Sequence, residues 1–427
     1  MNQANGDSKT LPTGWESRPI SEVTLRTRQR DPRKNPSIPF HYVDVSSVSN
    51  TSFSISSPTE LFGADAPSRA RKEIRTDDVL FATVRPTLKR VAIVPSALDG
   101  QIASTGFIVL RADRENLEPR YLYSRLLTDG FIKRMGELER GASYPAVRDF
   151  DVLNEVIPLP PPEEQRKIAA VLGVVQRAIE QQERLLALTA ELKKTLLHQL
   201  FTQGLRGEPQ KQTEIGLVPE SWELVKIGSL GKVVTGTTPK TKVPEYYLPP
   251  EVDFIAPADL GQTRQIYSSE KKISQRGLEV IRGLPKDAVM CVCIGSSIGK
   301  VGMTLKHDSA TNQQINSIIC NEKHDPDFVY YLMSYFAKYW RGFATFGPVP
   351  ILSKGAFEAI DIVVPATKVE EAEIAQCFTA LDAKSEVHMR RKDMLTDLFR
   401  TLLHHLMTAQ IRVHDLDLPE LEHAQVA

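Results

Sequence analysis

The chain has 427 residues, of which 25% are charged and 41% are hydrophobic, and its 53 Lys and Arg residues balance 53 Asp and Glu residues. At roughly 100–200 residues per domain, this length allows two or three domains that each bury a core. The zero net charge excludes a uniformly basic nucleic-acid coat and a polyanionic disordered chain, but it leaves room for local basic patches.

The cysteines and the first residues indicate the compartment. Cys291, Cys293, Cys320 and Cys377 form no CxxC pair, which argues against a zinc site and fits a reducing environment. Residues 1–10 lack the apolar stretch of a signal peptide, and no run of 18 apolar residues marks a membrane span. We therefore expect a cytoplasmic protein without a metal site and without membrane contact.

The sequence repeats itself once. PTGWE at residues 12–16 is matched 207 positions later by PESWE at residues 219–223. TLLHQLFT at residues 195–202 recurs after 206 positions as TLLHHLMT at residues 401–408, and further matches lie between them in the same order. Matches in one order at nearly one offset indicate a tandem duplication of a unit of about two hundred residues.

In the first repeat, residues 11–160 mix short β-type runs with turn residues. Residues 79–84 and 106–110 predict strands, because β-branched and other apolar residues dominate them and turns bound them. Residues 119–128 have the apolar spacing of a helix. We therefore expect a domain of mixed strands and helices.

A long helix is predicted over residues 161–203. Prolines precede it, the acidic Glu163 and Glu164 suit the positive end of its dipole, and no proline interrupts residues 163–203. Apolar residues recur at steps of three and four and form one seam, with a slip near Gln182. At 1.5 Å per residue, such a helix is about 60 Å long, which is far too long for the core of one domain.

The second repeat follows the same plan. Residues 204–216 separate the two repeats, and their glycines and proline predict a linker of turns and coil. Residues 217–366 predict a second mixed domain, with a strand at residues 288–293 and a helix at residues 327–339.

Residues 367–409 predict a second long helix, whose seam is weaker over the polar residues 383–393. The simplest way to bury both seams is to pack the two helices on each other. We therefore expect an α+β protein, in which two tandem mixed α/β domains are joined by an antiparallel coiled coil and related by an approximate two-fold axis. Residues 410–427 carry little signal and form the C-terminal tail of this division.

Three loops of the first domain are candidate DNA contacts. Each combines basic or hydroxyl side chains with turn residues. A solvated loop is the alternative for the two basic loops, and a simple link between a helix and the last strand is the alternative for residues 141–148. Arg offers paired hydrogen bonds to guanine, whereas Lys mainly serves phosphate. The candidate residues are Arg26, Arg28, Arg85, Lys89, Arg90, Ser143, Tyr144 and Arg148.

The matching places of the second domain carry different side chains. GSSIGK at residues 295–300 looks like a phosphate loop, but only three residues separate its glycines and no Ser or Thr follows its Lys, so an ATP site is disfavoured. A Gly-rich turn between two strands and a DNA-facing turn remain as interpretations. Amides at residues 312–314 suit either adenine or strand-edge hydrogen bonds. The candidate residues here are Thr237, Lys240, Ser296, Ser297, Lys300, Asn312, Gln313, Gln314 and Lys354.

No catalytic constellation is recognisable in the sequence. There is no N/D-P-P-Y/F motif for amino-methyl transfer, no FxGxG loop for S-adenosylmethionine, and no HExxH motif. We therefore expect that this chain has no catalytic residue and binds no cofactor itself.

In their order and duplication, these motifs resemble the DNA-specificity subunit of type I restriction–modification systems. The matching pieces are LP..W at residues 11–15 with VP..W at 218–222, PLPPPEEQ at 158–165, the strand and basic turn at 78–90 with ASTGF at 103–107, GTTP at 236–239 with NQQI at 312–315, and EIG at 214–216. The resemblance covers residues 11–408. The second repeat departs from it where VEEA at residues 369–372 stands in place of PEEQ at residues 162–165.

The resemblance implies a division of labour among several subunits. Each mixed domain would be a target-recognition domain that reads one half of a split, asymmetric site on double-stranded DNA, and the helices would set the unread gap. Two modification subunits would bring S-adenosylmethionine and would flip and methylate an adenine in each half-site. Two restriction subunits would bring ATP, Mg and the motor and nuclease activities. This chain would supply specificity and scaffold; the alternative is a coiled-coil scaffold that does not read DNA.

Overall fold

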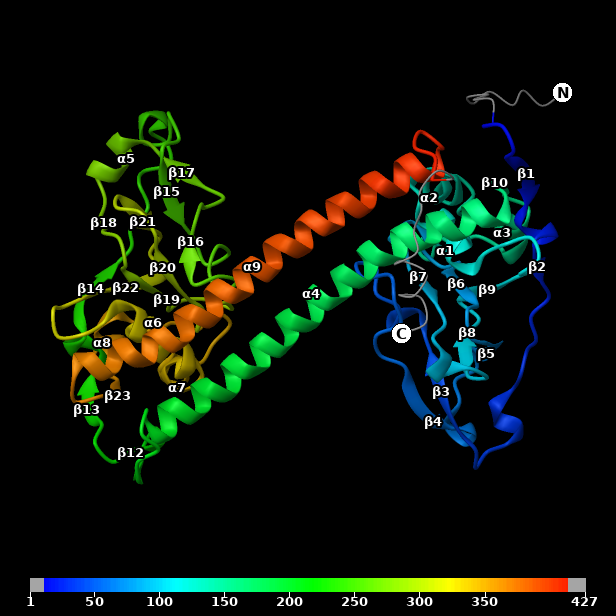
Figure 1. Cartoon of the computed structure of the whole chain (residues 1–427). Coiled ribbons are helices and arrows are strands. Elements are labelled where there is room, and N and C mark those ends of the chain that lie inside the picture. The colour runs from blue at the N-terminus through cyan, green and yellow to red at the C-terminus, as the bar shows by residue number, and fades with distance from the viewer. Residues whose placement is uncertain (1–10, 414–427) are drawn as a thin grey trace. The chain divides into compact units, whose positions relative to one another are not determined.

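The computed structural model describes residues 11–413, which form two compact units (Figure 1). The first unit comprises residues up to Arg184 together with those from Met389 onward, and the second is Leu185–His388. Helices α4 (Pro162–Gln203) and α9 (Lys368–Met407) each contribute one half to each unit. None of the helices among residues 11–413 has an apolar stretch long enough to cross a membrane. The chain is therefore an α+β protein of two units, as the sequence predicts.

The first unit contains two four-stranded sheets and one strand pair. The first sheet, antiparallel throughout, has the order β2 (Thr24–Leu25), β9 (Phe107–Ala112), β6 (Val79–Ala82), β7 (Val91–Ile93). The second has the order β4 (Thr59–Phe62), β3 (Pro39–Val43), β8 (Ile102–Ser104), β5 (Ala70–Glu73), with β3 and β8 parallel. The pair joins β1 (Glu16–Pro19) to β10 (Val156–Leu159). The strands predicted near residues 79 and 107 are confirmed.

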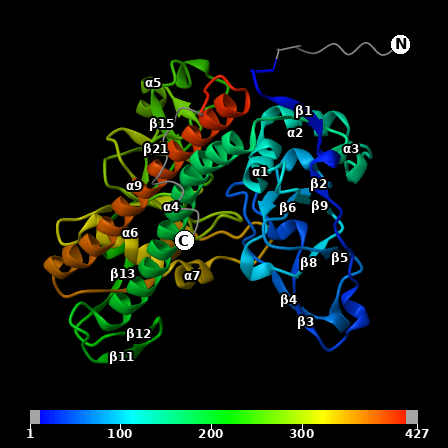
Figure 2. The same cartoon turned by 45° about the vertical axis from the view of Figure 1, so that its right-hand side comes forward.

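Strand β6 is buried on both faces. Val79 and Phe81 face one apolar cluster, and the alternate residues of the strand face another, as the two-residue period of a strand requires. Helix α1 lies beside β6 and β9 (Figure 2), and α2 packs on α1 and on the turn after β6. The side chains of Glu118 and Thr128 cap the first turns of the two helices. The helices of this region are α1 (Pro119–Leu127), α2 (Asp129–Glu137) and α3 (Asp149–Leu153).

The second unit repeats this strand order. Its first sheet has the order β14 (Gly231–Thr235), β22 (Ile315–Cys320), β19 (Val289–Val292), β20 (Val301–Thr304), with β16 (Gln265–Ile266) added at one edge. Its second sheet has the order β17 (Lys272–Ile273), β15 (Val252–Ile255), β21 (Ser309–Thr311), β18 (Gly283–Leu284), with β15 and β21 parallel. β13 (Glu223–Lys226) pairs with β23 (Asp361–Val364). The shared order confirms the duplication inferred from the sequence.

The core of the second unit is aromatic. Phe201, near the end of α4, stacks on Tyr335 with 4.9 Å between ring centroids and lies edge-on to Trp222 at 5.8 Å. Phe378 of α9 stacks on the same Phe201 ring at 6.3 Å, so both long helices enter this core. The shorter helices of this unit are α5 (Gln275–Glu279), α6 (Pro326–Tyr335), α7 (Ala337–Trp340) and α8 (Lys354–Ala359), and α6 lies over β19 and β20 (Figure 1).

Each repeat begins with a tryptophan that anchors the start of a long helix. The indole N–H of Trp15 donates to Glu164 over 3.1 Å, and that of Trp222 donates to Glu370 over 3.2 Å. Both rings are buried, and a buried indole N–H needs an acceptor. The repeated tryptophan therefore fixes the first turn of each helix to its own domain.

These bonds also correct the correspondence of the two helix starts. Glu164 corresponds to Glu370, so the repeats are offset by 206 here, and the pairing of PEEQ with VEEA is one residue out of step. The residues that follow these glutamates are equivalent at the same offset. Gln165 accepts a hydrogen bond from the backbone N–H of Glu118, and Glu371 accepts one from the backbone N–H of Asp325. Both helix starts share these side-chain hydrogen bonds, whereas only α4 begins with a proline, Pro162.

The segment between the repeats is not coil throughout. β11 (Gln210–Thr213) pairs antiparallel with β12 (Gly216–Pro219), which makes a hairpin at residues 210–219. The tight turn needs Gly216, whose φ is +115°. Lys211 secures the hairpin, because its ammonium donates to the backbone carbonyl of Trp222 over 2.5 Å. The expectation of coil over residues 204–216 is therefore wrong for its second half.

The thiols differ sharply in their expected reactivity. Burial raises the pKa of Cys293 and of Cys320 to about 12, and it raises the pKa of Cys291 well above its ordinary value. Because the thiolate is the reactive form, iodoacetamide at pH 8 should modify the exposed Cys377 roughly tenfold faster, or more, than the other three cysteines. Peptide mass spectrometry of the folded protein checks this, and equally fast labelling of Cys291 would contradict the packing of β19.

Candidate nucleic-acid interface

Two loops of the first unit are held together beyond the end of β6. The backbone N–H of Arg85 donates to the carbonyl of Pro145 over 2.7 Å, and Val84 forms a bridge with Ala146. The Arg85 guanidinium lies 5.8 Å from the centroid of the Tyr144 ring. The structure therefore brings together Arg85 and the loop that carries Tyr144, which are sixty residues apart in the sequence, and both side chains are exposed.

The turn after β6 is strained. Arg85 and Lys89 have φ values of 50° and 55° and flank the 3₁₀ turn at Pro86–Leu88. Residues other than glycine rarely adopt this left-handed conformation, which costs roughly 1–3 kcal/mol and persists only where the surroundings enforce it. Here the buried Pro86 and the hydrogen bond from Arg85 hold the turn in place. Such strain is typical of functional loops.

The other cations of this turn have partners. The ammonium of Lys89 lies 2.5 Å from a carboxylate oxygen of Asp129, which is itself almost fully exposed. The guanidinium of Arg90 donates to the backbone carbonyls of Val45 and Val48. Arg90 therefore ties the 44–48 segment to the loop, whereas Lys89 makes a solvent-exposed pair that a phosphate can replace.

Arg26 and Arg28 lie at the opposite end of the same sheet. Strand β2 pairs with the last residues of β9, whereas Arg85 follows β6 at the end where Ala82 pairs with Phe107. A cavity of about 760 Å³ opens at this opposite end. The sequence does not reveal this separation, because the residues around Arg26 and Arg28 do not show with which strand they pair or in which direction they run.

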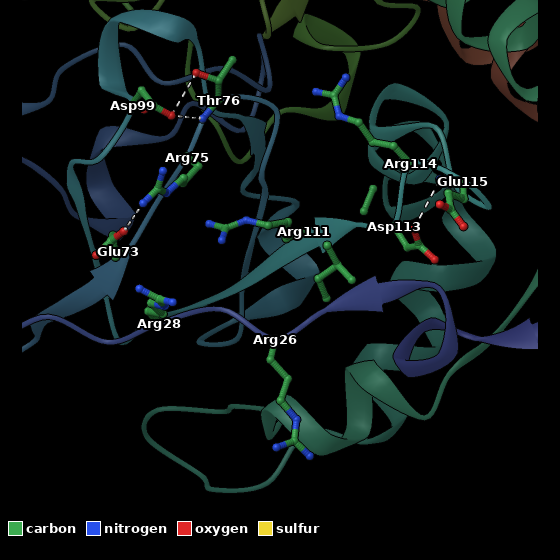
Figure 3. A pocket seen from close by; sticks show the side chains of 12 residues that line it. Arg26, Arg28, Glu73, Arg75, Thr76, Asp99, Arg111, Asp113, Arg114 and Glu115 are labelled. Atoms are coloured by element: carbon green, nitrogen blue, oxygen red, sulfur yellow. Dashed lines mark hydrogen bonds and ion pairs between the residues drawn. The ribbon is translucent and has the colours of Figure 1, made fainter.

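The cavity holds five arginines and four carboxylates. Its charged lining residues are Arg26, Arg28, Glu73, Arg75, Asp99, Arg111, Asp113, Arg114 and Glu115. Arg28, Arg75 and Arg111 extend toward the same space, whereas Arg26 points away from them (Figure 3). The N–H of Thr76 and the charges of Arg75 and Arg111 hold the pKa of Asp99 below its ordinary value. The cavity is thus nearly balanced in charge.

The second unit builds the same loop junction with other side chains. The N–H of Gly295 donates to the carbonyl of Pro350 over 2.9 Å, and Ile294 forms a bridge with Ile351. Gly295 corresponds to Arg85, and the loop around Pro350 corresponds to the loop around Pro145. Ser296 lies exposed on this junction and Ser297 is half-buried.

Amide side chains line the junction in the second unit. The amide nitrogen of Gln314 donates to the carbonyl of Ile294 over 3.4 Å, and its amide oxygen accepts from Asn312 over 2.9 Å. Gln313 is exposed and accepts from the hydroxyl of Thr238 over 2.8 Å. The segments at residues 237–238, 293–300 and 312–314 therefore converge, and Gln313 keeps its amide nitrogen free for an outside acceptor.

The loop at residues 295–300 is a strand-connecting turn. It joins β19 to the antiparallel β20, and both its glycines, Gly295 and Gly299, have φ near +95°. A nucleotide-binding loop of the Walker type leads into a helix instead. The ammonium of Lys300 donates to the carbonyl of Pro257 over 3.2 Å. The ATP interpretation is therefore excluded by the strand that follows the loop.

The remaining candidates lie at the rim of these loops. Thr237 accepts from the N–H of Arg282 over 3.3 Å, and Lys240 is exposed nearby in the sequence. Lys354 begins α8 and pairs with Glu358 over 3.5 Å. In the first unit, Ser143 is exposed beside Tyr144, and the exposed Arg148 precedes α3.

Sequence reasoning missed one residue of the junction. Phe346 is fully exposed and lies in the loop that ends at Pro350. An aromatic residue inside the Gly- and Pro-containing run FGPVP was a signal that it does not belong to a core. Among residues 11–413, no group of three or more His, Cys, Asp or Glu side chains is arranged to hold a metal ion.

Comparison with known proteins gives one consistent result. The family model of the type I restriction modification DNA specificity domain matches residues 12–190 and again residues 219–397. A protein of Methanocaldococcus jannaschii, provisionally named the type I restriction enzyme MjaX specificity subunit, is 24% identical over 94% of this chain and 95% of its own length.

Solved structures agree with these sequence matches. A chain from a structural study of the assembly and conformational transition of a type I restriction–modification system is 28% identical, covers 94% of this chain and all of its own, and has a TM-score of 0.53. The crystal structure of the type I S subunit from M. genitalium has a TM-score of 0.61 over 93% of this chain and 97% of its own, at 14% identity, and so supports the fold.

The contrast between Arg85 and Arg90 is testable through stability. Arg90→Ala removes the donor to two backbone carbonyls, one of them from the buried Val48, and should lower the free energy of unfolding by about 1–3 kcal/mol. Arg85→Ala keeps every backbone contact and should change it by less than about 0.5 kcal/mol. Urea denaturation of both variants measures the difference, and equal losses would contradict the roles drawn here.

Proposed function

The chain belongs to the DNA-specificity subunits of type I restriction–modification systems, and on this premise we propose that it reads a split, asymmetric site on double-stranded DNA. Residues 11–160 and 217–366 are the two recognition domains, and each reads one half of the site. The observation that carries this proposal is the shared junction, in which one backbone hydrogen bond to a proline carbonyl recurs with different side chains around it. One scaffold with two sets of side chains suits two different half-sites.

The side chains favour different bases in the two halves. Arg85 is exposed on the first junction, and an arginine there can form two hydrogen bonds to guanine. Gln313 is exposed on the second, and an amide suits adenine in the same way. Lys89, Lys240 and Lys354 act mainly on phosphates and so position the duplex.

The long helices set the gap between the half-sites by packing as an antiparallel coiled coil, with the two repeats related by an approximate two-fold axis. Ion pairs within each unit support this arrangement. In the first unit, Glu183 of α4 pairs with Lys392 of α9 over 2.8 Å, and Glu164 at the start of α4 pairs with Arg412, just beyond the end of α9, over 2.7 Å. The chain through α9 therefore runs in the opposite direction to α4. In the second, Lys193 of α4 pairs with Asp382 of α9 over 2.5 Å.

Two apolar patches on the helices are the docking sites for two modification subunits. Leu188 and Leu192 of α4 in the second unit, and Met394 and Leu398 of α9 in the first unit, are each about half exposed. The two pairs lie 206 positions apart, which is the offset of the repeat. Because exposed apolar positions on one helix face mark interaction surfaces, two equivalent patches support two copies of one partner.

The catalytic work belongs to those partners. The modification subunits bring S-adenosylmethionine and methylate adenine, and two restriction subunits bring ATP, Mg and the cutting and translocating activities. The named relatives of this chain are called specificity subunits, which supports a role in recognition and scaffolding rather than catalysis.

The DNA-reading role can be tested with a selected target. We expect the complex of this chain with its modification subunit to enrich, from a random duplex pool, one motif with two short halves and a fixed gap. Arg85→Ala combined with Lys89→Ala should weaken the first half by roughly tenfold or more and leave the second unchanged. Arg18→Ala, on the edge strand β1, is the matched control. Enrichment of no motif would favour the scaffold that does not read DNA.

The partner stoichiometry can be tested by charge insertion. Leu188→Glu with Leu192→Glu should remove one modification subunit, and Met394→Glu with Leu398→Glu should remove the other, because glutamate keeps the helix but cannot be buried in an apolar contact. Native mass spectrometry should show two partners on the unsubstituted chain and one on each double variant. Leu248→Glu, an exposed leucine outside the helices, is the control; two partners on both double variants would contradict the assignment.

A further inference from the structure

The loops at residues 141–145 and 346–350 have rigid bases. In the first, Arg140 and Ala146 exchange two backbone hydrogen bonds of 2.9 and 3.0 Å. In the second, the N–H of Thr345 donates to the carbonyl of Ile351 over 2.9 Å, and the Thr345 hydroxyl accepts from the N–H of Ile351 over 3.1 Å. Each loop ends in a proline whose carbonyl accepts from the neighbouring turn, so each tip is held in place from two sides.

Both tips present an aromatic ring to the outside. Phe346 is 102% exposed and Tyr144 is 75% exposed, whereas the large aromatic side chains of the cores are nearly all buried. Val349 adds a second exposed apolar side chain to the tip of the second loop. A fixed loop that carries fully exposed apolar groups is suited to insert them into an apolar space on a partner.

The surroundings of the tips identify that partner as a nucleic acid. The second tip adjoins the junction of Ser296, Gln313 and Gln314, and the exposed Lys338 and Arg341 precede it in the sequence. In the first, the Arg85 guanidinium lies beside the Tyr144 ring. An apolar tip among amides and cations matches a duplex, in which stacked bases lie inside and phosphates outside, better than it matches an apolar protein groove.

We propose that Phe346 in the second half-site and Tyr144 in the first insert into the duplex and stack on a base. This inference rests on the proposed DNA-reading function. It gives the loop tips a second role, the separation of stacked bases, which hydrogen-bonding side chains do not perform. The ring separates one base step and occupies the space, which lowers the work of extruding a neighbouring base. Each unit thus pairs a hydrogen-bonding junction with an apolar wedge.

Phe346 gives the sharper test, because its ring contributes nothing to the core. The complex of this chain with its modification subunit is bound to the duplex motif obtained by selection. Phe346→Ala should weaken binding about 5- to 150-fold, the range for loss of one base–aromatic stack, whereas Phe346→Trp should keep it. Val280→Ala, an exposed residue after α5 in the same unit, should bind as the unsubstituted chain does.

A fluorescent base locates the insertion. 2-Aminopurine, which brightens when it is unstacked, is placed in turn at each position of both half-sites except the methylated adenines. On binding, one position in the second half should brighten, lose this change with Phe346→Ala and keep it with Phe346→Trp. The signal of the first half, where Tyr144 inserts, should be the same with and without either Phe346 substitution.

Two results overturn the inference. Unchanged affinity and fluorescence with Phe346→Ala would show that the ring does not enter the duplex, although the DNA-reading function would stand. Failure of the unsubstituted complex to distinguish its motif from a scrambled duplex would remove the proposed function and the wedge together.

Discussion

In each repeat, a buried indole N–H donates to a glutamate in the first turn of a long helix. This bond joins the mixed domain to the helix and so fixes where the loops of that unit lie relative to the helix start. The two glutamates are buried to different extents, and the more deeply buried one has an additional charged partner. Glu164 is buried and also accepts two bonds from Arg412, whereas Glu370 is only partly buried and Arg206, the counterpart of Arg412, is exposed.

In each anchored domain, the residues that maintain the fold are different from those proposed to read DNA. The strand orders of the two units agree, and the hydrogen bond to Pro145 is reproduced at Pro350, so the backbone of the loop junction is the conserved part of the duplication within this chain. The exposed side chains differ, with arginine and tyrosine on one junction and amides with phenylalanine on the other. If these loops read DNA as proposed, a new target needs new side chains at the loops and no change of the core, because Val79 and Val289 face corresponding apolar clusters, one in each unit.

Much of the fold could be predicted because it follows local rules. No proline interrupts the long helices after the first residue of α4, and both carry an apolar seam. β6, β9, β19 and α1 lie where apolar runs and helical spacing predict them. The candidate site was harder, since it depends on pairings between distant segments. Nothing local shows that Arg28 lies at the far end of the sheet from Arg85, that Arg90 is occupied by backbone carbonyls, or that QKQT at residues 210–213 pairs with the strand after it.

A methylation map of the host shows directly whether this chain decides which DNA sequence is modified. Long-read sequencing would compare the host with and without this gene, with the modification subunit present in both. We expect a methyl-adenine motif of two short halves and a fixed gap that disappears when the gene is deleted. An unchanged map, together with no sequence preference of the purified complex, would contradict the account and leave a scaffold that does not read DNA.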